Sequence, residues 1–517
     1  MNQRRVDVVI LGSGFGGSLL SLILARSGRS VAVIDRATHP RFAIGESSTP
    51  LADQTLRRLA DRYEIPELRP LCSYGAWCQG YPDVVCGLKR GFSYFDQTTR
   101  STLGLGATSG VSVTEDSLTP IGDGQLLVAA SANDLVADTH WLRSDVDQLL
   151  FGLSAGYGVQ QIEQARYSIC HQNPGWNFSG SSGTGDFCVE SDFAVDASGA
   201  SRVLPEFLGI PDQTDTLRTH SSAVYAHFSD VRTVAEVLDE MNVCRSRHPF
   251  LCDAAAVHHV LDAGWMWQLR FDDDSVSAGF VMDQRQTDFN PMPPEGLWRK
   301  YLQQSSFVRS QFQESKVIRP STGLRFSGRL QRLTTKAAGD DWAALPNTAG
   351  FIDPLHSTGI AHTLMGIERL AGVLLDSASD VTRRSQLYRY SETLIDELRL
   401  VDALVEGCYA SLPVFRLWCA WCMVYFAAAT SAERIQTNGW TSFLKADDRD
   451  FRETVSRARE RLGWYSDLIR RGEVRQESGA SAFESELKAM IQPWNAVGLL
   501  DATTSGMYSQ TAAPLAE

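Results

Sequence analysis

The chain has 517 residues, of which 43% are hydrophobic and 21% charged, an ordinary composition for a globular protein. This length is enough for roughly two to four domains and for an enclosed cavity. The formal net charge of -13 at pH 7 argues against a nucleic-acid partner, because it leaves no basic stripe to bind phosphate groups.

The sequence shows no segment typical of export or membrane insertion. The apolar run VDVVIL near the N-terminus is too short for the core of a signal peptide and lacks a cleavage site. The most apolar stretch, residues 417–429, is well short of the roughly 20 residues that a membrane span needs, and it predicts a buried helix. Ten cysteines in such a chain are expected to be reduced thiols. We therefore expect a cytoplasmic protein without a membrane partner.

A strand, a glycine-rich turn, a helix and a second strand open the chain. VDVVIL leads into GSGFGG, an apolar-periodic helix and the strand VAVID. Gly12, Gly14 and Gly17 form the pattern GxGxxG, which lets the backbone approach a pyrophosphate at the N-terminus of a helix. Asp35 ends the second strand, where a carboxylate can bind ribose hydroxyls. This context predicts one dinucleotide-binding fold.

Further stretches favour FAD over NAD as the dinucleotide. GESSTP (45–50) follows the second strand, RSDVD (143–147) opens a helix, and FAVDASGASR (193–202) is a strand that runs into a turn of small residues. In residues 349–371 a turn at Asp353 precedes a helix whose first N–H groups can hold an anion. The chain contains only one nucleotide fingerprint, so we expect no second fold for a nicotinamide.

The remaining patterns predict β-structure first and helices later. Two strand-like runs between about 166 and 197 flank a flexible hairpin loop, SGSSGTG. Alternating stretches from about 223 to 282 predict a sheet that includes GWMWQLRF (264–271). From about Ile360 the pattern is mostly helical, and residues 503–517 are expected to form a loose tail.

Two tryptophans and an arginine in the predicted strand GWMWQLR lie on opposite faces. Trp265 and Trp267 share one face and either line a cavity or pack in the core, while Arg270 shares the other face with Gln268. Arg270 is either neutralised by the acidic run 272–274 or available to an acidic substrate or a carrier protein.

Cys419 and Cys422 form a single CxxC motif inside the predicted buried helix. No second such pair accompanies it, so we interpret both cysteines as core residues, with a redox or zinc role as the alternative. We predict no bound metal.

Five motifs in this order resemble the flavin-dependent halogenases, nearest their phenolic branch, within the aromatic hydroxylase-like flavoproteins. They are THPRFAIGESSTP, GLKRGFSYF, GWMW, FIDPLHSTGI and LWCAWCMVYF, and the resemblance covers at least residues 6 to about 430. It implies an α/β fold with a Rossmann-type FAD-binding domain, an inserted β-sheet substrate region and a helical C-terminal part. The implied boundaries are 1–84, 140–222 and 320–375 for the FAD-binding domain, 85–139 and 223–319 for the substrate region, and 376–517 for the helical region.

The resemblance also implies an activity. In that family FADH2 reacts with oxygen to a hydroperoxide, a chloride or bromide ion attacks it, and the hypohalous acid crosses a tunnel to a lysine that halogenates an electron-rich ring. The implied substrate is a small, phenolic aromatic of secondary metabolism, either free or bound to a carrier protein, and a separate NAD(P)H-dependent flavin reductase supplies the reduced FAD. The alternatives are an FAD-dependent monooxygenase or dehydrogenase on the same scaffold and a non-catalytic flavin-binding protein.

The family's functional residues can be placed on this chain one by one. Its lysine matches Lys89, whose ammonium can polarise hypohalous acid or whose amine can form a haloamine. Its halide site matches the backbone of Thr358 and Gly359, where the alternative is an ordinary helix start. The implied tunnel wall consists of Trp265, Trp267 and Phe92. The implied cofactor-binding residues are Gly12, Gly14, Phe15, Gly17, Asp35, Arg36, Glu46, Ser47, Arg143, Ala197, Gly199, Asp353, Gly359 and Ile360.

Two positions depart from the family pattern. Tryptophan halogenases have a glutamate at the position of His356 and phenolic members have an apolar residue, so His356 is either a catalytic acid or base or a polar wall residue. The signature WxWxIP ends here with Leu269 and Arg270, and an arginine lets the strand continue where a proline would end it. The absence of this proline puts the expectation of halogenation in doubt, and it leaves the expectation of flavin binding unchanged.

Overall fold

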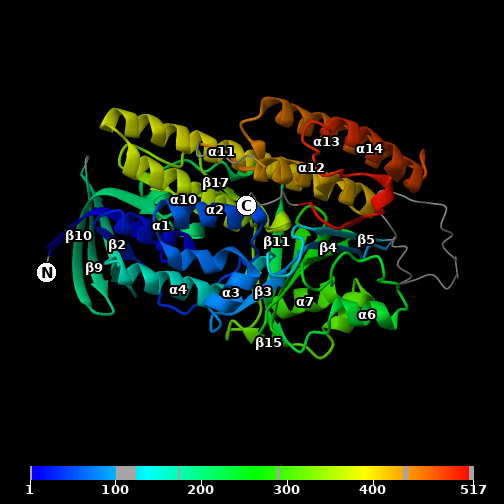
Figure 1. The fold of residues 1–517 in the computed structure, drawn as a ribbon, viewed down its shortest axis with the longest axis horizontal. Helices are drawn as coiled ribbons and strands as arrows, with labels where there is room; N and C mark the ends of the chain where they lie inside the picture. Colours follow the sequence, from blue (N-terminus) through cyan, green and yellow to red (C-terminus); the bar gives the residue numbers. More distant parts are fainter. Residues whose placement is uncertain (1–2, 100–123, 173–174, 288–291, 435–439, 512–517) are drawn as a thin grey trace.

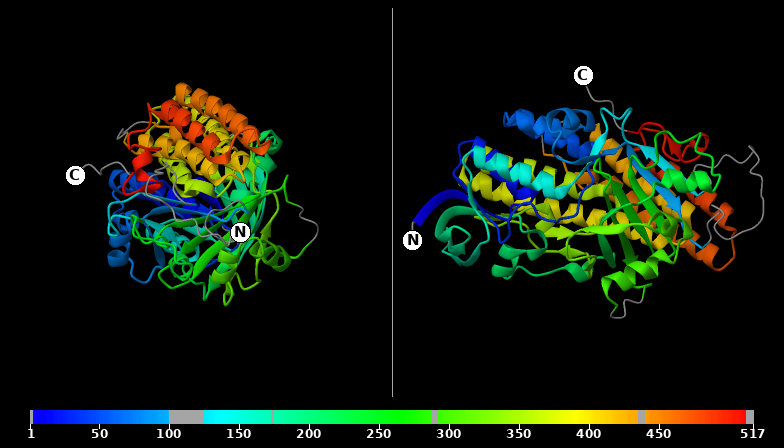
Figure 2. Two further views of the ribbon diagram at one scale, coloured as in Figure 1. Left: turned by 90° about the vertical axis from the view of Figure 1, so that its right-hand side faces the viewer. Right: turned by 90° about the horizontal axis from the view of Figure 1, so that it is seen from below.

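The computed structural model describes residues 3–99, 124–172, 175–287, 292–434 and 440–511. Two sheets lie end to end, and long helices run along one side of both (Figure 1). The left view of Figure 2 shows the layer formed by α11–α14 end-on, above the sheets. The helices are α1 (Phe15–Arg26), α2 (Pro50–Arg62), α3 (Tyr74–Gly80), α4 (Arg143–Gly156), α5 (Val203–Phe207), α6 (Val234–Glu240), α7 (Pro294–Leu302), α8 (Ser306–Gln311), α9 (Pro346–Ala349), α10 (Thr358–Asp376), α11 (Asp380–Ser411), α12 (Phe415–Glu433), α13 (Arg449–Arg470) and α14 (Gln476–Ile491).

The first sheet has seven strands in the order β7-β2-β1-β10-β9-β8, with β18 beside β10. Its strands are β1 (Gln3–Leu11), β2 (Val31–Ile34), β7 (Gln160–Ile162), β8 (Arg166–His171), β9 (Trp176–Ser182), β10 (Gly185–Asp196) and β18 (Trp342–Ala344). The pairs β7-β2, β2-β1, β1-β10 and β10-β18 are parallel, and all four residues of β2 are buried. Parallel strands are covered on both faces, which explains why β2 is apolar throughout.

The second sheet has nine strands in the order β15-β11-β14-β13-β12-β4-β5-β20, with β16 beside β11. Its strands are β4 (Gly91–Asp96), β5 (Gln125–Ala129), β11 (Ser221–Ser229), β12 (Ala256–Leu261), β13 (Gly264–Arg270), β14 (Val276–Asp283), β15 (Lys316–Arg319), β16 (Arg325–Ser327) and β20 (Met507–Tyr508). Trp265, Trp267 and Leu269 of β13 pack into the main core, and Met266 packs into a second core on the opposite face. The period of two predicted for GWMWQLR is confirmed.

Two short sheets connect these units to the site. One pairs β3 (Cys86–Lys89) with β6 (Asp138–Trp141), and the other pairs β17 (Arg332–Leu333) with β19 (Gly350–Phe351). The helix α10 follows directly after β19 and a one-turn 3-10 helix, so the motif FIDPLHSTGI forms the connection between sheet and helix.

The predicted fold class is confirmed, with two corrections. Residues 179–182 of the predicted loop SGSSGTG belong to β9, because they pair with β10, and the chain turns at 183–184. The second correction concerns the C-terminal end. β20 pairs in parallel with β5, and the side chain of Tyr508 is buried, with its hydroxyl accepting a hydrogen bond from the amide of Leu500. Residues 503–511 are therefore packed rather than loose, because one aromatic side chain and one strand edge attach them to the sheet. Residues 512–517 lie outside the described part of the chain. Within the described ranges, no helix combines the length and apolarity that a membrane crossing requires.

Candidate active site

A cavity of about 330 Å³ lies between the first turn of α1, the segment 44–47, strands β11 and β13 and the turn before α10. Eight of the predicted site residues line it: Phe15, Glu46, Ser47, Arg143, Trp267, Asp353, Gly359 and Ile360. The sequence places these residues far apart, so the fold has gathered the cofactor motifs around one space. We refer to it as the flavin-side cavity.

The glycine fingerprint forms a tight turn between β1 and α1. A Cβ atom on Gly17 would lie 2.0 Å from the carbonyl oxygen of Gly12, and one on Gly12 would lie 2.6 Å from the carbonyl oxygen of Ala197. Gly12 also has a φ of 106°, which favours glycine. No side chain caps the N-terminus of α1, which begins after Gly14, so its first N–H groups can receive a pyrophosphate. This part of the cavity fits a dinucleotide.

Asp35 holds the fingerprint loop in place. Its carboxylate accepts hydrogen bonds from the amide and hydroxyl of Ser13, at 2.7 and 2.8 Å, and pairs with Arg41 at 2.8 Å. Burial opposes ionisation, but the hydrogen bond and charge of Arg41 prevail and lower the pKa of Asp35. The neighbouring Arg36 is exposed, and Gly199 lies after β10 with a φ of 60°.

Arg143 ties α4 to the cavity wall. Its guanidinium makes two hydrogen bonds to Asp147, at 2.8 and 2.9 Å, and donates to the carbonyl groups of Ile44 and Gly45. The ring of Phe15 lies 4.7 Å from the guanidinium carbon. Burial opposes the charged form of Arg143, but the charge and hydrogen bonds of Asp147 outweigh burial and raise the pKa of Arg143. The guanidinium beside the cavity is therefore positively charged and paired with Asp147.

The turn before α10 is strained and firmly held. His356 and Ser357 both have left-handed backbone conformations, with φ values of 65° and 55°. The hydroxyl of Ser357 donates to that of Ser47 over 2.9 Å, and the hydroxyl of Tyr425 donates to the carbonyl of His356 over 3.0 Å. No side chain caps the first turn of α10, which starts at Thr358, so its amide groups face the cavity without a side-chain acceptor.

Asp353 faces inward from the same turn. It accepts hydrogen bonds from Ser221 at 2.6 Å, from Tyr409 at 2.9 Å and from the amide of Leu355 at 3.1 Å. Burial raises the pKa of Asp353 to about 6, against the effect of these hydrogen bonds. Trp265 donates to the same Tyr409 over 3.2 Å, so this network fixes the turn to β13.

Lys89 is fully buried, with 0% of its surface exposed. Its ammonium donates to the carbonyl oxygen of Ser48 and lies 4.2 Å from the ring centre of Phe92. Strand pairing places Lys89 opposite Asp138, and Ser48 donates to the carboxylate of Asp53 over 2.8 Å. Lys89, Asp138 and Asp53 thus form one buried charge cluster.

Burial shifts the proton equilibria of this cluster toward the neutral forms. It lowers the pKa of Lys89 to about 8, although Asp138 and Asp53 act in the opposite direction. It raises the pKa of Asp138 to about 6 and that of Asp53 well above its usual range. Lys89 and Asp138, which are permanently charged at a protein surface, therefore titrate close to neutrality here.

Lys89 contacts the segment 47–49, which reaches two spaces, and we refer to this segment together with Lys89 as the partition. A second, smaller cavity of about 20 Å³ is lined mainly by apolar and aromatic side chains, among them Phe92, Tyr425 and Phe426. Ser47 lines the flavin-side cavity and Thr49 lines the smaller one, and Ser48 between them accepts the hydrogen bond of Lys89. We refer to the smaller space as the substrate-side pocket. At this volume it holds roughly one water molecule.

The strand GWMWQLR divides its side chains as the pattern predicts. Trp267 lines the flavin-side cavity, and Trp265 is buried behind it. Arg270 points to the other face and donates to the carbonyl of Val231 over 2.8 Å, while Asp273 pairs with Arg319. The first alternative for Arg270 is wrong as a hydrogen-bonding partner, because a backbone carbonyl and not the acidic run accepts its hydrogen bond. Its role toward a substrate or a carrier protein stays a prediction, and the strand directs the side chain away from the flavin-side cavity.

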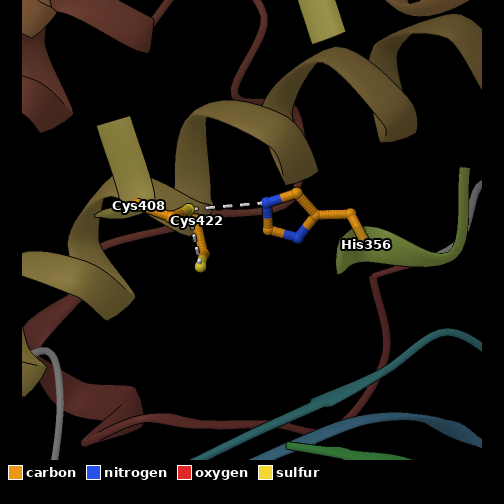
Figure 3. A group of neighbouring side chains, drawn as sticks. All are labelled: His356, Cys408 and Cys422. Atoms are coloured by element: carbon orange, nitrogen blue, oxygen red, sulfur yellow. Dashed lines mark hydrogen bonds between the residues drawn. The ribbon is translucent and has the colours of Figure 1, made fainter. Parts of the chain in front are cut away.

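Two groups of side chains among the described residues could hold a metal ion. One consists of His356, Cys408 and Cys422, and the other of Cys78, Cys86 and Asp272. Each offers three ligand atoms, whereas structural zinc sites take four. Figure 3 shows the imidazole of His356 directed toward the two thiols, which come from α11 and α12. Cys422 thus finds a spatial neighbour in Cys408, a residue outside the CxxC motif.

The comparisons with known proteins agree with this geometry. The family model for tryptophan halogenase matches residues 138–410, more than half of the chain. A tetracycline 7-halogenase from Kitasatospora aureofaciens is 27% identical over 80% of this chain and 72% of that protein. The monodechloroaminopyrrolnitrin halogenase PrnC from Pseudomonas fluorescens is 26% identical over 81% of this chain and 70% of that protein. The crystal structure of halogenase PltM with phloroglucinol and FAD superposes with a TM-score of 0.82 and 23% identity, covering 98% of this chain and all of that one, which supports the fold.

The chain therefore belongs to the tryptophan halogenase family of flavin-dependent enzymes. The predicted family, fold class and enzyme class are confirmed, and FAD and a halide belong to the chemistry of this family.

Proposed function

We propose that this protein halogenates a small phenolic aromatic, using chloride or bromide, oxygen and FADH2 delivered by a separate NAD(P)H-dependent reductase. The observation that carries the proposal is the buried Lys89 in the partition between two cavities. A hydroxylating enzyme has no need of such an arrangement, because oxygen transfer requires contact between flavin and substrate. A halogenating enzyme needs it, because its oxidant must travel from one space to the other.

The flavin-side cavity supplies the cofactor site. The uncapped first turn of α1 would hold the pyrophosphate of FAD, Arg143 and Glu46 line the same cavity and would contact the bound cofactor, and Asp353 fixes the turn before α10 through its hydrogen bond to Leu355. When bound, reduced FAD supplies the two electrons that activate oxygen for oxidation of the halide. The amides of Thr358 and Gly359, at the uncapped start of α10, form the halide site, since a helix N-terminus attracts an anion.

Lys89 receives hypohalous acid from that side. Its ammonium donates a hydrogen bond to the oxygen of the acid, which makes the halogen more electrophilic toward an aromatic carbon, and as the O–halogen bond breaks the ammonium gives its proton to the oxygen, which leaves as water. The carboxyl groups of Asp138 and Asp53 favour the charged lysine, take up the proton that the ring releases and return it to Lys89. Trp267 and Phe92 cover the two sides of the partition and exclude bulk water from the oxidant.

The substrate binds in the substrate-side pocket. Aromatic side chains on its wall suit a flat ring, and the buried Glu433 provides an acceptor for a phenolic hydroxyl. At about 20 Å³ the pocket has to widen to admit a ring, so side chains such as Tyr425 and Phe426 move when the substrate enters. The tetracycline halogenase and the phloroglucinol complex of PltM support a free phenolic substrate.

The function can be tested with purified protein, FAD, a flavin reductase, NADH and either chloride or bromide. A panel of phenols, with phloroglucinol as the first member, is analysed by mass spectrometry for replacement of hydrogen by halogen. The expected result is a halogenated phenol that requires the halide. A hydroxylated product that forms without halide would establish a monooxygenase instead, and absence of any product with all phenols would support a flavin-binding protein without catalysis.

A further inference from the structure

A pair of thiols lies behind the partition and has no part in the proposed reaction. The sulfur of Cys408 is 3.9 Å from that of Cys422 and 3.7 Å from Nε2 of His356 (Figure 3). These three side chains are at most 1% exposed. Cys408 lies on α11 and Cys422 on α12, so the contact joins two helices.

The thiol pair is close to both cavities although it opens into neither. The residues on either side of His356 in the turn approach the flavin-side cavity, which Pro354 and Ser357 line. The imidazole of His356 stacks on the ring of Tyr425, with 4.3 Å between the ring centres, and Tyr425 lines the substrate-side pocket. An oxidant that misses the substrate therefore meets the His356–Tyr425 layer first and the thiols directly behind it.

The chemistry of the three groups suits capture of a halogen electrophile. Thiols react with hypohalous acid by attack of sulfur on the halogen, which gives a sulfenyl halide and water. A second thiol then displaces the halide ion, forming a disulfide and releasing one proton. Nε2 of His356 lies 3.7 Å from the sulfur of Cys408, and burial keeps its imidazole neutral, so the proton released on disulfide formation passes to solvent. In total, one hypohalous acid and two thiols give one disulfide, one water, one halide ion and one proton.

We propose that Cys408 and Cys422 are an internal oxidation site, which consumes hypohalous acid left in the partition when no aromatic substrate is bound. The inference rests on the proposed function, because it takes its oxidant from that reaction. The disulfide links α11 to α12, and reduction by an external dithiol restores the two thiols.

The test compares oxidant that the protein produces during turnover with oxidant that is added from outside. The protein turns over with FAD, reductase, NADH and bromide, without a phenol, in the presence of catalase and excess free methionine, which remove peroxide and escaped oxidant. After alkylation, non-reducing peptide mass spectrometry measures the Cys408–Cys422 disulfide and the oxidation of the exposed Cys78, Cys170 and Cys244. A parallel sample receives hypobromous acid from outside, without turnover.

During turnover we expect the buried pair to be oxidised about tenfold more than the exposed thiols, and the order to reverse when the acid is added from outside, because accessibility then decides. Omission of bromide or addition of phloroglucinol is expected to suppress the disulfide. Cys419, on the same helix as Cys422 and also buried, provides the matched control: Cys419→Ala keeps the disulfide, and Cys408→Ala abolishes it.

Two results would overturn the inference. Exposed thiols oxidised first during turnover, or a disulfide that forms equally without bromide, would exclude internal capture while brominated phloroglucinol still forms in the phenol arm. Absence of brominated product in that arm would refute the proposed function, and the inference with it. The product and the disulfide are separate masses in the same experiment, so the two failures are distinguishable.

Discussion

Two buried charge clusters in this protein behave in opposite ways. The first joins Glu397, Arg369 and a histidine between α10 and α11, and the second joins Lys89 and Asp138 in the partition. Both are removed from solvent, so burial opposes ionisation in each. We propose that the first cluster stabilises the fold and that the second takes part in the reaction, and the difference between their pKa values is the basis of this distinction.

The cluster between α10 and α11 is fully compensated. Glu397 pairs with Arg369 at 2.8 Å, lies 2.9 Å from Nε2 of His362 and accepts a hydrogen bond from the amide of Phe443 at 2.6 Å. Burial opposes the charge, but Arg369 and His362 prevail and lower the pKa of Glu397 to about 2. At neutral pH this carboxylate stays ionised, and it fastens two helices and the segment before α13.

The cluster in the partition is compensated only in part. Lys89 donates to one backbone carbonyl, and its pKa falls to about 8, while the pKa of Asp138 rises to about 6. A group that is poised near neutrality can exchange a proton during each turnover, and a group held at one extreme cannot. We propose that incomplete compensation marks the Lys89 cluster as the reactive one, and the predictions below test that contrast.

Removing Lys89 should have the largest effect. In Lys89→Met we expect the rate of phenol halogenation to fall on the order of 10³-fold, because the group that polarises hypohalous acid is gone. FAD affinity and NADH-driven oxygen consumption should stay within about twofold, since the flavin-side cavity is unchanged. Lys336→Met, at an exposed lysine, is the control. Equal product formation by Lys89→Met and the parent would exclude the role of the lysine.

Removing the charge of Glu397 should cost stability instead. Glu397→Gln leaves Arg369 buried without its partner, so we expect the free energy of unfolding to fall by about 3–5 kcal/mol at pH 7. The folded-state pKa is lowered, so this stabilisation is present above about pH 4.5 and is lost as the pH falls through about 2. Denaturation with urea measures the difference. Glu368→Gln, which breaks the half-buried pair with Arg58, should cost less than about 1 kcal/mol.

A loss as small as that of the Glu368 control would show that the Glu397 cluster is not structural. A fall in halogenation beyond about twofold at a temperature where Glu397→Gln remains folded would remove the contrast between the two clusters.

The pH profile should respond to Asp138. The proposed function uses the ammonium form of Lys89, so halogenation by the parent should fall as the pH rises through about 8. In Asp138→Asn we expect this alkaline limb to move to lower pH by roughly one unit, because an opposing carboxylate is lost. Initial rates between pH 6 and 9 measure the shift, with the exposed Asp134→Asn as control. A rate that instead rises through pH 8 would favour the neutral amine.

Other ionisable groups face Lys89 and remain in place in that variant. They are Asp53 on α2, Glu433 on α12, His140 on β6 and His258 on β12. Burial lowers the pKa of His140 to about 3, so its protonation does not change between pH 6 and 9. The pKa of Asp53 is raised in part by Asp138, so the shift reports the charge of the pair Asp138–Asp53 and not a change at His140.

The smallest effect is expected at the position where the chain departs from the family signature. Arg270 points away from both cavities and donates to Val231, so Arg270→Ala should change KM and kcat by less than about twofold. Steady-state kinetics with phloroglucinol measures both constants. A KM raised tenfold with kcat unchanged would show that Arg270 binds the substrate after all.

The sequence predicts those parts of the site that depend on local motifs. GxGxxG and PLHSTG each fold within one turn, so the glycine turn and the start of α10 could be located from their neighbours in the chain, while Lys89 in GLKRGF was assigned through the resemblance to the family. The faces of β13 followed from its period of two. These features need no knowledge of which strand lies beside which.

Features that depend on distant pairing escaped prediction. Asp138 meets Lys89 only because β6 pairs with β3, and Cys408 meets Cys422 only because α11 packs against α12. The partner of Arg270 is a backbone carbonyl, which carries no signal in the side-chain pattern. The acidic run 272–274 therefore suggested the wrong hydrogen-bond partner for Arg270. The CxxC motif suggested Cys419 as the partner of Cys422, whereas the structure places Cys408 beside Cys422.

The most direct test of the partition cluster is the pKa of Lys89 itself. The chain has six lysines, and Lys89 is the one that is fully buried. Lysine labelled with ¹³C at Cε gives few NMR signals, and Lys89→Met identifies the signal of Lys89 by its loss. We predict that this signal titrates with a pKa of about 8 in the FAD-free protein. A value near 10.5 for Lys89 would contradict the account, because the lysine would then be as fully ionised at neutral pH as any lysine at the surface.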